Sequence, residues 1–236
     1  MAPAMNHKGS QEAMSDTFTL ANCAPQVGEG FNRDWWARLE WFVRGLALRK
    51  EHAAVHVVTG PLYLPTRQGA GERWRASHDF LGEAPQLLAV PTHFFKAVAV
   101  ENASGKCEAM GAFVVPNAPI PAGAPLEAFA VGIEELEAAA GMTLFPEAGR
   151  PRAVEERRVV RRAEQARRRM AGGGAQLALP SGETDSEDEP GKAKGRLQHL
   201  CAAPEACVLP PERFWLQGKK KGGGERAASE LPARKA

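Results

Sequence analysis

The sequence contains no uninterrupted run of about 18 apolar residues, so it predicts no transmembrane helix. Its first residues show neither the apolar core of a secretory signal nor an Arg-rich transit helix. Only 4 of the 236 residues are cysteine, and they form neither a Cys-x-x-Cys pair nor a Cys/His zinc spacing. These absences argue against a membrane span, a zinc-finger module and a disulfide-built secreted domain.

Apolar periodicity is also missing from much of the second half of the chain. Nearly all of the Trp, Phe, Val and Leu pattern lies between Phe18 and Phe145, whereas residues 149–198 are almost entirely Arg, Ala, Gly, Glu and Ser. Because 44% of all residues are hydrophobic, the chain is able to bury a real core. We therefore expect one folded domain over residues 1–148, followed by a largely disordered extension.

The extension divides by composition into three parts. Residues 149–196 join an Arg-rich run to the acidic stretch ETDSEDE, which is typical of a low-complexity linker. Residues 197–217 form a short segment that holds Cys201 and Cys207, either as a disulfide or as packed thiols, and reduced thiols are the favoured state. Residues 218–236 form a basic tail that we expect to be disordered.

The Arg-rich run RPRAVEERRVVRRAEQARRR holds nine Arg against three Glu. Either its arginines bind nucleic-acid phosphates through counterion release, or the run is a solvated insertion. The second interpretation is favoured, because no aromatic residues interleave the run for base stacking. The candidate phosphate-binding side chains are Arg157, Arg158, Arg161 and Arg162.

Two helices and three strands are predicted between residues 32 and 141. Residues 32–50, NRDWWARLEWFVRGLALRK, have the apolar period of an α-helix, with Asn32 as its N-cap. A second helix is predicted over residues 125–141, with Gly141 as its C-cap. Stretches rich in Val and aromatics predict strands at residues 53–64, 86–100 and 111–120. The expected fold is α+β, with an antiparallel sheet and flanking helices.

Asn32, Trp36, Glu40 and Arg44 are spaced by four and form one stripe of the first helix. The simpler interpretation is a cap followed by an exposed Glu40–Arg44 pair, which stabilises a helix by only about 0.2–0.5 kcal/mol. The alternative is a site for a hard cation. Mg²⁺ prefers oxygen ligands and keeps most of its waters, so an amide oxygen suffices if a carboxylate orders the waters and a guanidinium meets the phosphate. Composition alone favours the first interpretation.

Three longer stretches change that balance: APAMNHKGSQEAMSDTFTLANCAPQVGEGFNRDWWARLEWF, VVTGPLYLP and VPTHFFK. Over residues 1 to about 146 they resemble the endonuclease G branch of the DNA/RNA non-specific endonucleases, which are ββα-metal nucleases of mitochondria. The resemblance implies a ββα-metal nuclease fold that lacks its first strands here. It also implies DNA and RNA as substrates, a homodimer and a mitochondrial location.

The same resemblance assigns roles to the candidate residues. Asn32 matches the family's metal-ligating Asn, which implies Mg²⁺ as cofactor, with Mn²⁺ as an alternative. Asn22, in LANCAPQ, matches the Asn that holds the catalytic His in place. Glu40 and Arg44 match the Glu and Arg that order the metal waters and the phosphate. On the resemblance, the functional interpretation of the stripe becomes the favoured one.

The family's catalytic motif is Asp-Arg-Gly-His, and this sequence begins at the residue that follows that histidine. We therefore expect an N-terminally truncated chain without the general base. Neither His7, in Asn-His-Lys, nor His93, in a predicted strand, is favoured as a substitute base. The leading hypothesis is a Mg²⁺-dependent, sugar-non-specific endonuclease whose activity in this chain is lowered or abolished by the missing base. The alternative is a catalytically dead nucleic-acid-binding protein that keeps the metal and phosphate site.

Overall fold

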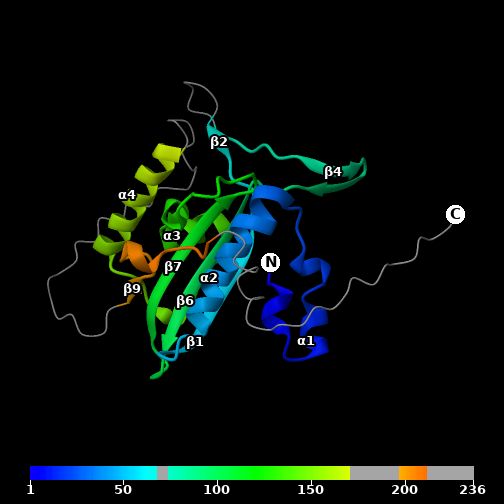
Figure 1. The fold of residues 1–236 in the computed structure, drawn as a ribbon. Coiled ribbons are helices and arrows are strands. Elements are labelled where there is room, and N and C mark those ends of the chain that lie inside the picture. Colours follow the sequence, from blue (N-terminus) through cyan, green and yellow to red (C-terminus); the bar gives the residue numbers. More distant parts are fainter. Residues whose placement is uncertain (68–73, 171–196, 212–236) are drawn as a thin grey trace.

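The computed structural model describes residues 1–67, 74–170 and 197–211 (Figure 1). Its centre is an antiparallel sheet in the order β1-β6-β7-β8, and β9 joins β7 in parallel. The strands are β1 (His52–Leu62), β2 (Thr66–Arg67), β3 (Trp74–Arg75), β4 (Phe80–Glu83), β5 (Gln86–Ala89), β6 (His93–Asn102), β7 (Cys107–Pro116), β8 (Ala130–Val131) and β9 (Gln198–His199). The α-helices are α1 (Gln11–Asp16), α2 (Ala37–Ala47), α3 (Ile133–Ala140) and α4 (Ala153–Met170). The predicted α+β fold with an antiparallel sheet is confirmed.

The sheet has a core on each of its two faces. Successive side chains of a strand point to opposite faces, so Phe94 and Val98 of β6 pack in the cluster that includes α2, whereas Phe95 and Ala97 pack in the cluster that includes α3. Figure 1 shows α2 lying along β1 and β6. The central strand is therefore apolar on both faces, and a polar side chain within it requires an explanation.

The helix that carries the stripe starts differently from the prediction. Residues Gly28–Trp36 (η3) form a kinked π-helical segment that runs directly into α2. Asn32 lies inside this segment, where its N–H donates to the Val27 carbonyl at 3.0 Å, so the predicted N-cap at Asn32 is wrong. Gly30 enters the segment at a φ of 77°, and a Cβ there would lie 2.9 Å from the Pro119 Cβ. Both facts favour glycine at this position.

Two other predicted elements are divided in the structure. The predicted strand at 86–100 is β5, which pairs with β4 in a separate hairpin, followed by β6 in the central sheet. The predicted helix at 125–141 is a 3₁₀ turn, η4 (Leu126–Phe129), then β8, then α3. Gly141 is the left-handed C-cap of α3, as predicted. Three further 3₁₀ turns precede α2 or follow α3: η1 (Ala4–His7), η2 (Leu20–Asn22) and η5 (Pro146–Ala148).

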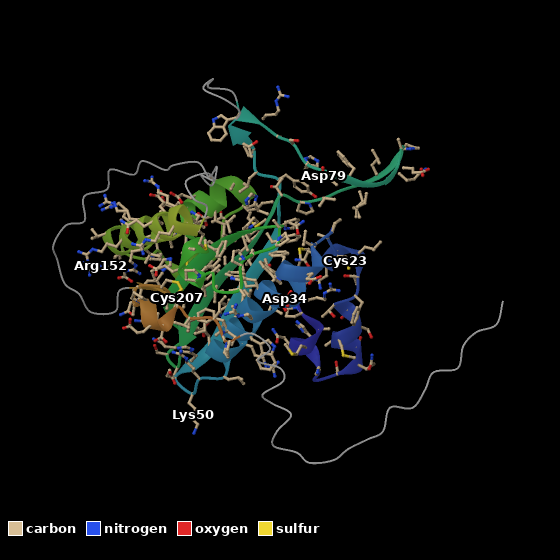
Figure 2. All side chains as sticks on the ribbon, turned by 45° about the horizontal axis from the view of Figure 1, so that its top comes forward. Cys23, Asp34, Lys50, Asp79, Arg152 and Cys207 are labelled. Atoms are coloured by element: carbon tan, nitrogen blue, oxygen red, sulfur yellow. A yellow bond between two sulfur atoms is a disulfide. The ribbon has the colours of Figure 1, made fainter. Side chains whose placement is uncertain are left out.

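Part of the region expected to be a disordered extension is folded. Residues 153–170 form α4, and its Val159 and Ala163 are completely buried in the core. After β9 and the turn η6 (Pro204–Ala206), Cys201 and Cys207 form a disulfide, so the expectation of reduced thiols is wrong (Figure 2). The linker assignment is likewise wrong for α4. The acidic stretch and the basic tail lie outside the described residues. Within the three described ranges, no helix is long and apolar enough to cross a bilayer.

Candidate active site

The stripe predicted from the sequence lies on the continuous rod formed by η3 and α2. Neither half of its simpler interpretation is found. Asn32 does not cap the helix, and the ion pairs of the described chain do not include Glu40 with Arg44. The polar side chains of the stripe do not bond one another: Asn32 has no partner among the described residues, and Glu40 and Arg44 bond other residues. This arrangement favours the functional interpretation.

Asn32 is exposed, and its side chain makes no hydrogen bond to the described part of the chain. The side chain that bonds a main-chain N–H at the start of this helix is Asp34 and not Asn32. The Asp34 carboxylate accepts from the Gly30 N–H at 2.6 Å. The amide oxygen of Asn32 is therefore free to bind a ligand.

Glu40 is held in place by its neighbour one turn earlier. The indole N–H of Trp36 donates to Glu40 Oε1 at 3.1 Å, and Trp36 itself is only 1% exposed. Burial raises the pKa of Glu40, and this effect is opposed by the positive charges of Lys96 and the Met1 amino group and by the Trp36 hydrogen bond. Glu40 is thus an oriented, half-buried carboxylate whose charged form is disfavoured by burial and favoured by the nearby positive charges.

Arg44 links α2 to the N-terminal segment. Its Nη1 donates to the Met5 carbonyl and to Asn6 Oδ1, both at 3.2 Å, and its guanidinium lies 5.7 Å from the centre of the Trp41 ring. The Nε and Nη2 groups make no hydrogen bond to the described residues. Arg44 therefore retains donors with which to meet an anion.

Asn22 clamps the first residues of the chain. Its Oδ1 accepts from the Ala2 N–H at 2.7 Å, and its Nδ2 donates to the Ala2 and Thr17 carbonyls, each at 2.8 Å. The Asn22 carbonyl also accepts from the Met1 amino group at 3.0 Å. The side chain thus fixes the main chain at Ala2, and the Asn22 carbonyl holds Met1.

The two histidines weighed as bases occupy different surroundings. Burial lowers the pKa of His93 to about 4, and its Nδ1 lies 3.0 Å from the Thr92 hydroxyl. His7 is exposed at the end of η1. Neither ring pairs with a carboxylate among the described residues.

The arginines of α4 separate into two groups. Arg157, Arg158 and Arg161 are exposed. Arg162 is half-buried: it donates to the Glu127 carboxylate and to the Cys201 carbonyl, so it ties α4 to two other segments. Arg162 is therefore a structural residue, and the first three remain as candidate phosphate contacts.

Sequence reasoning missed Lys96, which lies on β6 and is only 2% exposed. Its Nζ lies 4.7 Å from the centre of the Trp36 ring. Burial lowers the pKa of Lys96 to about 8, and the Glu40 charge partly opposes this shift. The signal was present in the sequence as a lysine inside the apolar run HFFKAVAV.

The oxygen donors on this rod suit a strongly hydrated cation. Among the described residues, no three His, Cys, Asp or Glu side chains gather into a metal-binding group. The rod offers the free amide oxygen of Asn32 and, two turns further on, the oriented carboxylate of Glu40. A hard divalent cation that keeps most of its waters fits this set, because few protein ligands are then required.

Comparisons with known proteins point to one family. The model of the DNA/RNA non-specific endonuclease family matches residues 1–150. The mitochondrial nuclease of Saccharomyces cerevisiae is 48% identical over 148 residues, which are 61% of this chain and 44% of that protein. The mitochondrial endonuclease G of Homo sapiens is 42% identical over 146 residues, which are 62% of this chain and 47% of that protein. The chain thus spans about half the length of these curated relatives.

The fold agrees as well. A crystal structure of the EndoG/EndoGI complex matches with a TM-score of 0.58 and 39% sequence identity, and covers 66% of this chain and 60% of that chain. The family match extends over well more than half of the sequence and includes all the residues of the stripe. This chain therefore belongs to the DNA/RNA non-specific endonuclease family.

Proposed function

We propose that this protein is a metal-dependent endonuclease that hydrolyses phosphodiester bonds in DNA and RNA, with Mg²⁺ bound at Asn32. The observation that carries the proposal is that an unbonded, exposed Asn32 and an oriented Glu40 lie on the same helical rod. An ordinary surface helix would use these two side chains for a cap and an ion pair. Mn²⁺, which also accepts oxygen ligands, is the alternative cation.

Each residue of the site has a separate task in this proposal. Asn32 holds the cation through its amide oxygen, and Glu40 accepts hydrogen bonds from the ordered waters around it. Arg44 bonds Met5 and Asn6 through Nη1, and it orients a phosphate with its other donors, Nε and Nη2. When bound, the cation would stabilise negative charge on the phosphoryl and leaving oxygens. Because water is the nucleophile, no ribose 2′-hydroxyl is needed, and both DNA and RNA are substrates.

Asn22 serves the general base indirectly. Asn22 fixes the main chain at residues 1 and 2, and in this proposal it holds the general base in place, which is the role that its match in the family implies. Asp-Arg-Gly-His does not occur in this sequence, and His7 and His93 have no carboxylate partner in the described chain. A catalytically inactive nucleic-acid-binding protein with the same metal site is therefore the second candidate.

The test is plasmid and RNA cleavage with Mg²⁺ by two purified proteins: the chain as printed, and the chain preceded by Asp-Arg-Gly-His and its strand. We expect the second to nick both substrates, and the first to be slower by about 10²–10⁴-fold, the usual contribution of a general base. Asn32→Ala should abolish cleavage by the second protein. Gln86→Ala, which removes an exposed amide from the β4–β5 hairpin, is the matched control.

Three results would contradict the proposal. If the chain as printed cleaves as fast as the extended one, the base lies within it and His7 becomes the residue to replace. If Asn32→Ala and Gln86→Ala cleave equally well, the metal is bound elsewhere. If neither protein cleaves but both bind nucleic acid in a Mg²⁺-dependent way, the second candidate function is correct.

The exposed face of α4 is the part of the Arg-rich run that supports nucleic-acid binding. Arg157, Arg158 and Arg161 are free of the contacts that hold Arg162. Replacing these three residues with Ala should flatten the salt dependence of nucleic-acid binding, because each phosphate contact contributes about one to the slope of log K against log salt. An unchanged slope would remove α4 from the interface.

The names of the relatives support a mitochondrial location for this protein, since both the yeast and the human relatives are named as mitochondrial. Expression of the full-length gene product with a C-terminal fluorescent tag tests this directly. Co-localisation with a mitochondrial marker is the expected result, and a diffuse signal would contradict it.

We also propose a homodimer, and the β4–β5 hairpin supports it. The hairpin stands away from the central sheet (Figure 1), and two isolated strands are marginally stable in water. Both of its faces are apolar: Leu81 pairs with Leu88 on one, and Phe80 and Leu87 lie on the other, each about half exposed. A symmetric contact between the hairpins of two copies would cover these faces.

Sedimentation of the purified chain tests the dimer. Leu81→Glu with Leu88→Glu should convert a dimer to a monomer, because two carboxylates then face the partner. Leu48→Glu is the matched control, since Leu48 is 71% exposed at the end of α2. A monomeric starting protein, or a dimer that survives the double substitution, would refute the proposal.

A further inference from the structure

Lys96 is a buried charge that the proposed mechanism does not use. It lies in the middle of β6, between Thr59 of β1 and Phe113 of β7, on the face that packs against α2. Its neighbours on that face, Phe94 and Val98, are fully buried and apolar. Burying an ammonium group costs several kcal/mol unless other groups compensate it, so a lysine here has to be matched by something nearby.

The compensating group is the indole of Trp36. Lys96 Nζ lies 4.7 Å from the ring centre, which is within the range of a cation–π contact. The ring has little freedom to move, because the rings of Phe31 and Phe94 pack against it with centroids 5.6 and 5.9 Å away. Trp36 therefore holds Lys96 in a fixed position.

The same indole also contacts Glu40, through its N–H group. Its Nε1–H donates to Glu40 Oε1 at 3.1 Å, while its face receives the Lys96 cation. Lys96 and Glu40 do not form a direct ion pair in the described chain, so the indole links them. A cation on the ring face withdraws electron density from the ring, which strengthens the N–H as a donor to the carboxylate.

We propose that Lys96, acting through Trp36, is a positioning residue that fixes the Glu40 carboxylate in place and stabilises its negative charge. The charges that act on Glu40 agree with this role. Burial disfavours the carboxylate, and the largest opposing effect comes from Lys96, followed by the Met1 amino group and the Trp36 hydrogen bond. What the ionised Glu40 then does, ordering the waters of Mg²⁺, rests on the function proposed above.

The experiment measures Glu40 itself, in the full chain and without any cleavage assay. Carbon NMR of protein labelled at the Glu side-chain carboxyl gives the pKa of Glu40, with Glu40→Gln used to assign the signal. Lys96→Met keeps the length of the side chain and removes its charge, so the pKa of Glu40 should rise. Lys96→Arg restores the charge and should bring the pKa back toward the starting value. Lys106→Met, at an exposed position, is the matched control.

A second variant separates positioning from mere packing. Trp36→Phe keeps one aromatic ring in the core but removes the N–H donor together with the second ring of the indole, so it too should raise the pKa of Glu40. Folding is checked by near-UV circular dichroism, and Lys96→Met should remain folded because it replaces a buried charge with an apolar group of similar size. An unchanged Glu40 pKa in folded Lys96→Met would overturn the proposal, and so would an equal shift in Lys106→Met.

Isothermal titration with Mg²⁺ alone distinguishes this proposal from the one on which it rests. Lys96→Met should weaken Mg²⁺ binding about tenfold, the lower end of the effect seen when groups behind a metal site are lost. If Asn32→Ala leaves Mg²⁺ binding unchanged, the proposed metal site is wrong, while the effect of Lys96 on Glu40 is still decided by NMR. If Asn32→Ala weakens binding and Lys96→Met does not, Lys96 does not position Glu40 for the metal.

Discussion

His199 makes the folded state of this protein sensitive to acid, and the structure gives the sign of the effect. The side chain is 2% exposed in β9, and its Nδ1 accepts from the Cys201 N–H at 3.0 Å. Its own main-chain N–H donates to Glu155 of α4 at 2.7 Å. Burial, with a smaller contribution from the Arg162 charge, lowers the pKa of His199 from 6.5 to about 4.

As the pH falls below 6.5, the unfolded chain takes up a proton at this residue, and the folded chain does so only near pH 4. The depressed pKa therefore contributes stability that is fully present above pH 6.5 and is lost as the pH falls to about 4. A difference of this size corresponds to about 3 kcal/mol. Burial lowers the pKa of His93 in the same way, so His93 adds to the loss in every variant compared here.

Urea unfolding followed by tryptophan fluorescence, at pH values from about 7 down to about 4, measures this contribution. His199→Asn places an amide oxygen where Nδ1 accepts from Cys201, and it carries no titrating group. We expect the free energy of unfolding of the wild type to fall by about 3 kcal/mol more than that of His199→Asn over this range. His7→Asn, at an exposed position, should follow the wild type. Equal losses in the wild type and His199→Asn would refute the reasoning.

Three further predictions concern the segments that close the domain. Reduction of the disulfide, or Cys207→Ser, should cost about 2 kcal/mol of stability, because the bridge closes a loop with a sequence separation of only 6; thermal melts with and without a reductant check this. Val159→Ala should cost about 2 kcal/mol in a urea titration if α4 is docked as described, whereas Arg158→Ala, on the exposed face, should be nearly neutral. Asn22→Ala removes three side-chain hydrogen bonds and should expose the Ala2 amide to rapid hydrogen exchange, and an unchanged exchange rate would contradict the clamp.

The elements that the sequence predicted well are those with a strong local signal. The apolar period of residues 32–50 gave the main helix, and the Val-rich stretches gave β1 and β7. Gly141 was predicted as a C-cap because a left-handed residue at a helix end favours glycine, and the structure has it at a φ of 67°. In these cases the information lies within a few neighbouring residues.

The elements that were missed depend on contacts between distant segments. The composition of α4 is that of a solvated helix, and its two small buried residues, Val159 and Ala163, are too weak an apolar signal to predict docking. Docking depends on Arg162, whose partners Glu127 and Cys201 lie 35 and 39 residues away in sequence. The disulfide was missed because compartment and spacing alone do not decide whether two thiols are paired.

Motifs and periodicity are local properties of the chain, and they sufficed to predict the family, the antiparallel α+β fold and the spacing of Asn32, Glu40 and Arg44. The contacts of these residues follow from the folded arrangement: Asn32 is unbonded in the described chain, and Glu40 bonds Trp36, whose ring contacts Lys96, 56 residues further along than Glu40. The charge and orientation of a half-buried carboxylate depend on the groups that surround it in space. Those neighbours come together only when the sheet and α2 pack.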